Sequence, residues 1–171
     1  MVSSLSSNEY EVFKIVFKQH DPDITTLCTQ LQGKFTNKQA NFVTEIPDTR
    51  YVSKLKSTGL KKIHKSLLEL SKTLRLDIKD PPKKYKDKIK ACIHGLNFII
   101  NTEIFIIYTL QEGPIVWYKH NSNTCKECKP NGKCVITLEL ILKERGLELP
   151  SEVQKEDIDE QAKWVFQSIV R

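Results

Sequence analysis

Three of the five cysteines in this chain of 171 residues are close together, in the pattern Cys-x2-Cys-x5-Cys. They are Cys125, Cys128 and Cys134. Thiolates are preferred ligands of structural zinc and of iron–sulfur clusters, and two thiolates separated by two residues can bind one metal centre. A bend at Pro130–Gly132 lets the third thiolate return to the same point. The pattern therefore predicts zinc or an iron–sulfur cluster. A disulfide is the alternative, against which the odd number of cysteines argues.

The predicted centre needs a further ligand, because structural zinc and cubane clusters normally take four protein ligands. No cysteine or histidine follows Cys134, so the ligand has to come from upstream. His120 lies five residues before Cys125 and would complete a zinc site. Cys92 would instead complete an all-cysteine site, which suits a 4Fe–4S cluster. The residues leave both candidates open. Cys28 falls on the apolar face of a predicted helix, and we expect it to be a core residue.

Motifs for catalysis are missing near the cysteines. The chain has no His-Glu-x-x-His motif, no paired carboxylates beside the cysteines and no glycine-rich phosphate loop. Cys92 and His94 are two positions apart, so on a predicted helix their side chains would diverge. We therefore expect a protein that is not an enzyme and a metal centre whose role is structural.

Basic residues are concentrated between Arg50 and Lys90. This stretch has 14 Lys and Arg against 4 Asp and Glu, whereas the net charge of the whole chain is +6. Such a density suits a phosphate backbone or an acidic protein surface, although a solvated helix face is the alternative. The residues that we expect to contact nucleic acid or a polymerase are Lys61, Lys62, Lys65, Lys83, Lys84, Lys86, Lys88 and Lys90.

The first half of the chain carries apolar residues at helical spacing. Thr36–Gln39 has the spacing of a capping box, and Ser7 or Asn8 can cap the first helix. Short helices joined by tight turns are compatible with a winged-helix unit. Pro81 and the proline after it stop any helix, so a domain boundary is predicted after residue 80. The predicted helices are 8–19, 24–31, 36–46 and 58–76.

The second half combines helices with a β-hairpin. Residues 83–100 are predicted as a helix with a basic start, and the β-branched segments 103–110 and 114–119 as the two strands of a hairpin. Trp117 and Tyr118 then point to opposite faces, and helices follow at 135–145 and after Pro150. The fold class is mainly α with a β-hairpin. It comprises a winged-helix-like helical domain, 1–80, and a small α+β metal- or cluster-binding module, 81–171.

No targeting or membrane segment is visible in the sequence. The start lacks a basic stretch followed by an apolar one, so no secretory signal is predicted. The most apolar run, 98–110, is interrupted by Asn101, Thr102 and Glu103 and is too short to span a bilayer. We expect a protein of the cytoplasm, associated with the nucleoid, or of the nucleus, without a membrane partner.

Two apolar stretches, Ile106–Tyr108 and Ile115–Val116, precede the cysteine pattern. With this order of features, the chain from Phe105 to Cys134 resembles one transcription family, the archaeal transcription factor E beta subunit and the TFIIE-beta-related winged-helix subunit of RNA polymerase III. The resemblance implies a 4Fe–4S cluster at the cysteines. It also implies a heterodimer with an alpha subunit that binds RNA polymerase and opens promoter DNA. The polymerase subunit has its fourth cysteine soon after the third, whereas here no cysteine follows Cys134 and the ligand would be Cys92.

Two functions follow as expectations. The first is a basal transcription factor subunit that binds RNA polymerase with a partner subunit and assists promoter opening. It would contain a structural 4Fe–4S cluster or zinc. The alternative is a zinc-stabilised DNA-binding regulator that acts without a polymerase partner. A cluster-dependent nucleic-acid enzyme would need catalytic residues that we do not find in the sequence.

Overall fold

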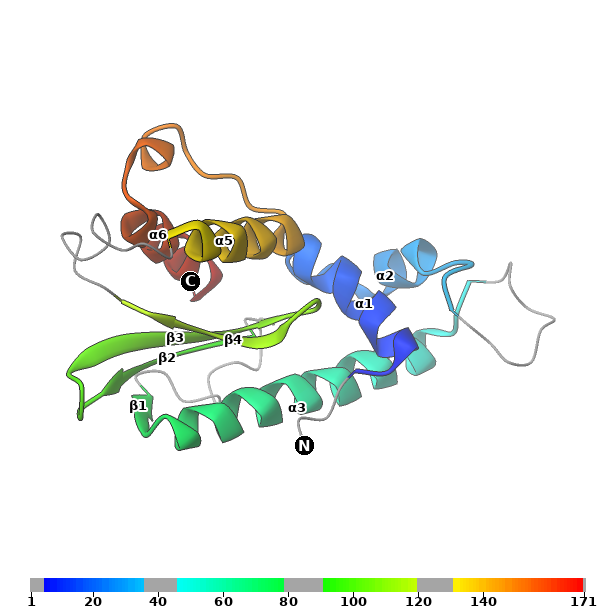
Figure 1. Cartoon of the computed structure of the whole chain (residues 1–171). Helices are drawn as coiled ribbons and strands as arrows, with labels where there is room; N and C mark the ends of the chain where they lie inside the picture. Colours follow the sequence, from blue (N-terminus) through cyan, green and yellow to red (C-terminus); the bar gives the residue numbers. More distant parts are fainter. Residues whose placement is uncertain (1–4, 36–45, 79–90, 120–130, 171) are drawn as a thin grey trace.

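The computed structural model describes residues 5–35, 46–78, 91–119 and 131–170. A four-stranded antiparallel sheet forms the middle layer. Figure 1 shows helix α3 along one face of the sheet, helices α5 and α6 along the other, and α1 beside both layers. The fold is therefore mixed α and β, and the predicted hairpin is part of a larger sheet.

The first two helices lie where the apolar spacing predicts them. Helix α1, Ser7–Lys18, begins with a capping box in which Ser6 Oγ accepts from the Glu9 amide at 3.3 Å and Glu9 Oε2 accepts from the Ser6 amide at 2.7 Å. The cap is thus Ser6 and not one of the two residues after it. Helix α2, Ile24–Gln30, is capped by Asp23. The predicted helix at 36–46 lies almost wholly outside the described residues.

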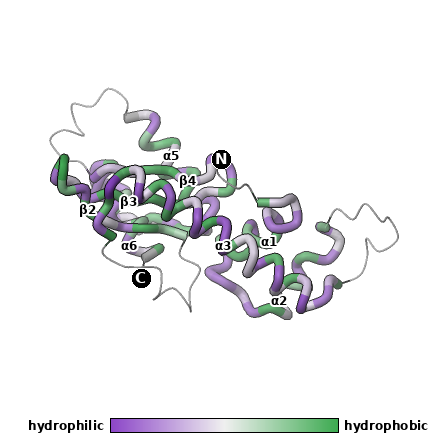
Figure 2. The backbone as a smooth tube through the Cα atoms, turned by 90° about the horizontal axis from the view of Figure 1, so that it is seen from below, coloured by the Kyte–Doolittle hydropathy of each residue, from purple (hydrophilic) through white to green (hydrophobic). Residues whose placement is uncertain are grey.

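Helix α3 is longer than predicted and spans Thr49–Thr73. It begins earlier because Asp48 Oδ1 accepts hydrogen bonds from the amides of Arg50 and Tyr51, at 2.8 and 3.2 Å. Polar and apolar residues alternate along it, as Figure 2 shows. It ends before Leu76, which belongs to the first strand. The apolar face of α3 packs against the sheet, because residues of both belong to one core.

The strands are β1, Leu76–Ile78; β2, Cys92–Asn97; β3, Thr102–Thr109; and β4, Gly113–Tyr118, each paired antiparallel with the next. The predicted hairpin is confirmed by β3 and β4. The prediction of a helix over residues 83–100 is wrong for 92–97, which form a strand. Gly95 shows one reason, because a Cβ there would lie 2.7 Å from the Asp77 carbonyl oxygen. The close pairing of β1 and β2 therefore needs glycine at this position.

The sheet separates two apolar clusters. Trp117 is 7% exposed and Tyr118 is 37% exposed, which confirms that they point to opposite faces. Cys28, at 2% exposure, is a core residue as predicted. The first core, under α1 and α3, includes Val12, Phe13, Leu27, Ile63, Leu67, Ile93, Ile104 and Ile106. The second core, under α5 and α6, includes Cys92, Phe105, Ile107, Trp117, Leu138, Ile141, Val165 and Phe166.

The predicted domain boundary after residue 80 falls in a segment outside the described residues. Strand β1, before that segment, pairs with β2, after it. The first core likewise joins Leu67 of α3 to Ile104 of β3. The division into 1–80 and 81–171, the winged-helix-like unit and the separate metal module remain predictions.

Candidate functional site

Two of the predicted metal ligands lie in the described part of the chain, and both belong to the second core. Cys92 is the first residue of β2 and is 2% exposed. Cys134 is half-buried and packs against the same core from helix α5. Cys28 lies in the first core, on the other side of the sheet. The fold thus places Cys92 and Cys134 at the second core and Cys28 in the first.

Helix α5, Asn131–Arg145, begins earlier than the predicted start at residue 135. Cys134 is therefore in the first turn of a helix, where the positive end of the helix dipole favours an anionic group such as a thiolate. A second thiol side chain in the same apolar layer suits a soft metal or a cluster. The residues present fit the predicted centre in this respect.

The remaining predicted ligands, Cys125, Cys128 and His120, lie outside the described residues. Within 5–35, 46–78, 91–119 and 131–170, no three His, Cys, Asp or Glu side chains are grouped so that they could hold a metal ion. The fourth ligand, Cys92 or His120, therefore stays a prediction. A cluster would be held by Cys92 and Cys134 together with the two cysteines between β4 and α5.

Arg145, the last residue of α5, is a buried cation near the C-terminal end of strand β3. It is 4% exposed, and its Nη2 donates to the Tyr108 carbonyl oxygen at 2.8 Å. Burial lowers the pKa of Arg145 to about 10, while its interactions with Cys92 and Glu144 act in the opposite direction. Sequence reasoning did not identify this residue, because a terminal basic residue of a helix is usually exposed.

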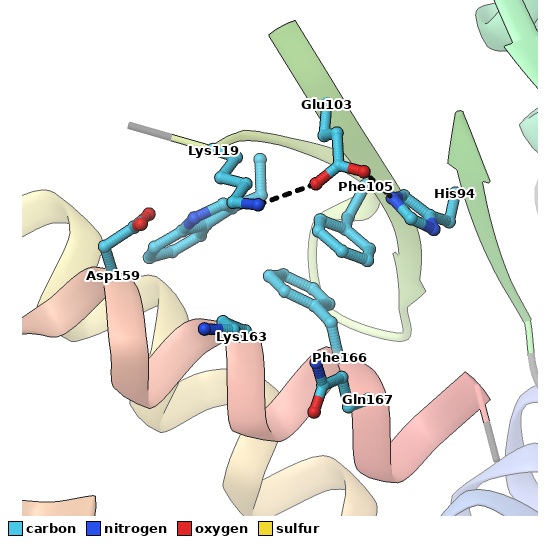
Figure 3. Close-up of a pocket in the computed structure, with 9 residues that line it drawn as sticks. His94, Glu103, Phe105, Lys119, Asp159, Lys163, Phe166 and Gln167 are labelled. Atoms are coloured by element: carbon cyan, nitrogen blue, oxygen red, sulfur yellow. Dashed lines mark hydrogen bonds and ion pairs between the residues drawn. The ribbon is translucent and has the colours of Figure 1, made fainter. Parts of the chain in front are cut away.

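A cavity of about 280 Å³ lies between α6, Ile158–Val170, and the sheet. Three rings are stacked beside it, as Figure 3 shows. His94 lies on Phe105 with ring centres 4.2 Å apart, and Phe105 lies on Phe166 at 4.6 Å. Trp117 meets the Phe166 ring edge-on at 5.7 Å. The strand pattern predicts only that Trp117 and Tyr118 point to opposite faces, and the contacts of Phe105 and Trp117 with Phe166 depend on the tertiary structure.

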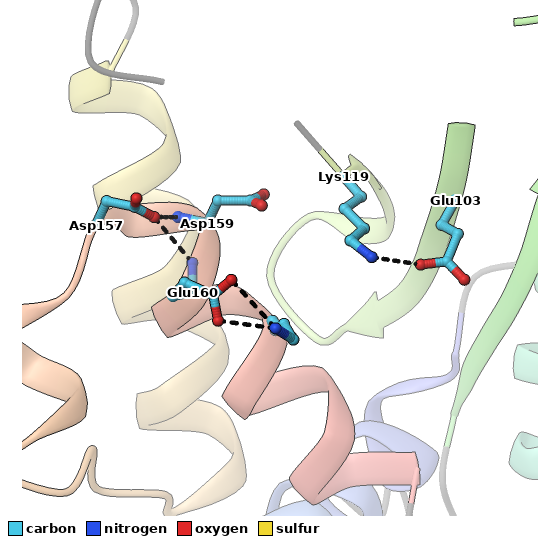
Figure 4. A network of polar contacts seen from close by, with 6 residues as sticks. Glu103, Lys119, Asp157, Asp159 and Glu160 are labelled. Carbon is cyan, nitrogen blue, oxygen red and sulfur yellow. Dashed lines mark hydrogen bonds and ion pairs between the residues drawn. The ribbon is translucent and has the colours of Figure 1, made fainter. Parts of the chain in front are cut away.

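Charged residues surround this cavity. Glu103 accepts a hydrogen bond from Lys119 Nζ at 2.8 Å, and its other oxygen lies 3.6 Å from His94 Nε2. The hydrogen bond with Glu103 raises the pKa of Lys119. Across the cavity, Asp157 caps α6 by accepting from the amides of Asp159 and Glu160, as Figure 4 shows. Lys119 directly precedes the segment that carries Cys125 and Cys128, so a residue that lines the cavity is next in sequence to the predicted metal ligands.

The outer face of α3 carries a line of five exposed cations, the cationic stripe. They are separated by 4, 7, 4 and 7 residues, so at about 100° per residue they fall within an arc of roughly 60°. The arc is opposite the buried residues Val52 and Ile63. The stripe runs for about 33 Å at 1.5 Å per residue. Its members are Arg50, Lys54, Lys61, Lys65 and Lys72.

The predicted contact residues divide into three groups. Lys61 and Lys65 belong to the cationic stripe. Lys62 lies outside it, because its Nζ donates to Glu9 Oε2 at 2.6 Å between α3 and α1. The five lysines between residues 83 and 90 lie outside the described part of the chain. Arg50, Lys54 and Lys72 were not singled out from the sequence, although their regular spacing along the helix could have indicated them.

Comparison with known proteins gives no match to a family model, to a curated protein or to a solved structure. Among the described residues, no helix is both long and apolar enough to cross a membrane.

Proposed function

We propose that this chain is a non-enzymatic subunit of the basal transcription machinery. It binds RNA polymerase together with an alpha-type partner subunit and assists promoter opening. The chain carries a 4Fe–4S cluster whose role is structural. The observation that carries the proposal is the position of Cys92 and Cys134 on β2 and α5 in one apolar core. This grouping supports an all-cysteine site, and such a site suits a cluster better than zinc.

The role of the centre is to hold the cysteine segment against the sheet. Cys92 is on β2 and Cys134 is on α5, so a centre bound by both would join the two elements on either side of the second core. Metal binding and folding of this layer would then be coupled. Because protein thiolates would fill the coordination of the centre, the centre has a structural role and does not react with a substrate.

The partner-binding surface comprises the exposed cationic stripe and the basic residues between 83 and 90, which lie outside the described part of the chain. The cationic stripe on α3 and the lysines between residues 83 and 90 supply the positive charge that a phosphate backbone or an acidic polymerase surface requires. Such a surface acts by attraction and positioning, which agrees with a factor that assists a polymerase and has no catalytic residues of its own.

The metal proposal is tested by purifying the full chain without oxygen. We expect a brown protein with about four irons and four sulfides per chain. Cys92→Ser and Cys134→Ser should lose the colour and the iron, whereas Cys28→Ser is the matched control and should keep both. A colourless protein with zinc, retained in Cys92→Ser and lost in His120→Ala, would instead support the DNA-binding regulator that acts without a polymerase.

The transcription proposal is tested with the metal-loaded chain and RNA polymerase. We expect the chain to co-purify with the polymerase and its alpha-type partner, and to raise the permanganate reactivity of promoter thymines. The cluster-free Cys92→Ser variant should do neither. A loaded chain that binds no polymerase and leaves promoter reactivity unchanged would show that the transcription proposal is wrong.

A further inference from the structure

The turn between β2 and β3 exposes three consecutive apolar side chains, the apolar turn. Phe98, Ile99 and Ile100 are 66%, 69% and 52% exposed. Asn97 holds the turn in shape, because its Oδ1 accepts from the amides of Ile99 and Ile100 at 2.9 and 3.3 Å. Asn101 adopts a left-handed backbone conformation with φ of 46°. The apolar side chains are therefore displayed to solvent by an ordered turn.

The apolar turn lies at the end of the cationic stripe. Asn97 Nδ2 donates to the Leu74 carbonyl oxygen at 2.8 Å, just beyond the end of α3. Asn97 is also paired with Leu76 across β1 and β2. Figure 1 shows this turn and the C-terminal end of α3 at the same end of the molecule. The apolar turn and the Lys72 end of the stripe are therefore at the same end of the molecule.

We propose that the cationic stripe and the apolar turn together bind a junction between double-stranded and single-stranded DNA. The stripe lies along the duplex and contacts backbone phosphates where the strands approach it, and the apolar turn stacks on the last base pair of the duplex. Apolar side chains such as Phe and Ile insert between or against bases in several DNA-bending proteins. The inference deepens the proposed function, on which it rests, by assigning residues to the contact with opened promoter DNA.

The form of the two features favours DNA over other partners. The stripe is one side chain wide and about 33 Å long, roughly the length of one turn of a DNA duplex, and a narrow line of cations suits an elongated polyanion. A membrane surface is broad, so a protein that binds it would be expected to present a wide patch of cations and not a line one side chain wide. A stable protein interface buries about 800 Å² on each partner, far more than three side chains supply. Stacking on a base needs only a small apolar surface.

Within the described residues the stripe has few acidic neighbours. Lys65 lies 3.8 Å from Glu69 and both side chains are well exposed, so this pair leaves the lysine accessible. No ion pair of Arg50, Lys54, Lys61 or Lys72 is found in the described ranges. An anionic ligand at these four side chains would displace no ion pair within the described part of the chain.

The experiment measures binding of the full metal-loaded chain, without polymerase, to labelled DNA by fluorescence anisotropy. Three probes of equal length are compared: a forked duplex, a blunt duplex and a single strand. We expect the fork to bind about tenfold more tightly than the blunt duplex, because the apolar turn adds a stacking contact. Equal affinity for the fork and the duplex would overturn the inference.

Two pairs of variants separate the contributions of the turn and the stripe. Ile99→Asp should abolish the preference for the fork, whereas Ile136→Asp, at an equally exposed isoleucine on α5, should keep it. Lys61→Gln combined with Lys65→Gln should weaken binding to all probes and reduce the salt slope by about 0.9 for each charge. Lys14→Gln with Lys155→Gln, two exposed lysines away from the stripe, is the control and should leave the slope unchanged.

Two outcomes would reject the assignment of the turn. One is a fork preference that survives Ile99→Asp. The other is binding to phosphatidylserine vesicles that Ile99→Asp removes, which would make the apolar turn a lipid contact. Because polymerase is absent from these assays, they can fail while the proposed transcription role stands, and the polymerase assays can fail while fork binding stands.

Discussion

The guanidinium carbon of Arg145 lies 3.7 Å from the centre of the Phe17 ring. This contact joins the end of α5 to the end of α1, while the same guanidinium donates to the Tyr108 carbonyl on β3. One buried cation therefore connects both helical layers to the sheet. The next residue, Gly146, allows the ends of α5 and α1 to approach closely, because a Cβ on Gly146 would lie 2.8 Å from the Lys18 carbonyl oxygen.

Replacing Arg145 by leucine should destabilise the fold by about 3 kcal/mol, because a buried carbonyl loses its charged donor and the ring contact is lost. Urea unfolding followed by circular dichroism measures the change. Lys143→Leu, an exposed basic residue of the same helix, is the control and should change stability by less than about 0.5 kcal/mol. If the two variants were equally stable, Arg145 would not connect the layers as we describe.

The ion pair between Glu9 and Lys62 should make stability depend on pH. Burial alone would raise the pKa of Glu9, but hydrogen bonds from Lys62 and Ser6 hold it below its ordinary value of 4.5. A carboxyl with a lowered folded pKa contributes stability that is fully present above 4.5 and is lost as the pH falls through the folded pKa. The contribution is therefore intact at neutral pH.

Glu9→Gln should consequently lower the free energy of unfolding by about 2 kcal/mol at pH 7, since the Gln side chain accepts a weaker bond from Lys62. The difference from the natural chain should shrink as the pH falls below 4.5. Chemical unfolding at several pH values measures it, with Glu11→Gln on the same helix as the control. A difference that stays constant down to acid pH would contradict the assignment.

Gly59→Ala should destabilise α3, against the usual order of helix propensity. Alanine normally stabilises a helix interior over glycine by about 1 kcal/mol. Here the added Cβ would collide with the Phe13 ring in the first core, so we expect a loss of about 1 to 3 kcal/mol. Thermal unfolding measures the sign. Phe13→Leu combined with Gly59→Ala should recover part of the loss relative to Phe13→Leu alone, and an increase in stability of Gly59→Ala would contradict the contact.

The turn between β3 and β4 should depend on Glu144. Its two carboxylate oxygens accept from the amides of Leu110 and Gln111, at 2.7 and 3.1 Å. Glu144→Ala removes both charge-assisted bonds and should cost about 2 kcal/mol. Hydrogen exchange should show faster exchange of these two amides in Glu144→Ala. The exposed control Glu139→Ala should leave them protected, and unchanged exchange in Glu144→Ala would contradict the role of this carboxylate.

Sequence periodicity alone predicts those helices and strands whose residues follow a single helical or strand pattern of apolar side chains. The β-branched residues of 103–110 and 114–119 predict two strands, and the short link between them predicts a hairpin, which β3 and β4 confirm. The apolar spacing of 24–31 likewise predicts helix α2 and the burial of Cys28. The cysteine spacing identifies Cys125, Cys128 and Cys134 as metal-ligand candidates. The structure places Cys134 against the same core as Cys92, one of the two upstream candidates for the fourth ligand.

The tertiary structure decided what periodicity could not. Residues 92–97 carry apolar side chains that fit helical spacing as well as a strand, and only pairing with β1 and β3 selects the strand. The stacking of Phe166 on Phe105, the burial of Arg145 and the position of the apolar turn beside α3 follow from that sheet. The physical reason is that local pattern depends on consecutive residues, whereas these features depend on contacts between residues far apart in the chain that form only when the layers pack.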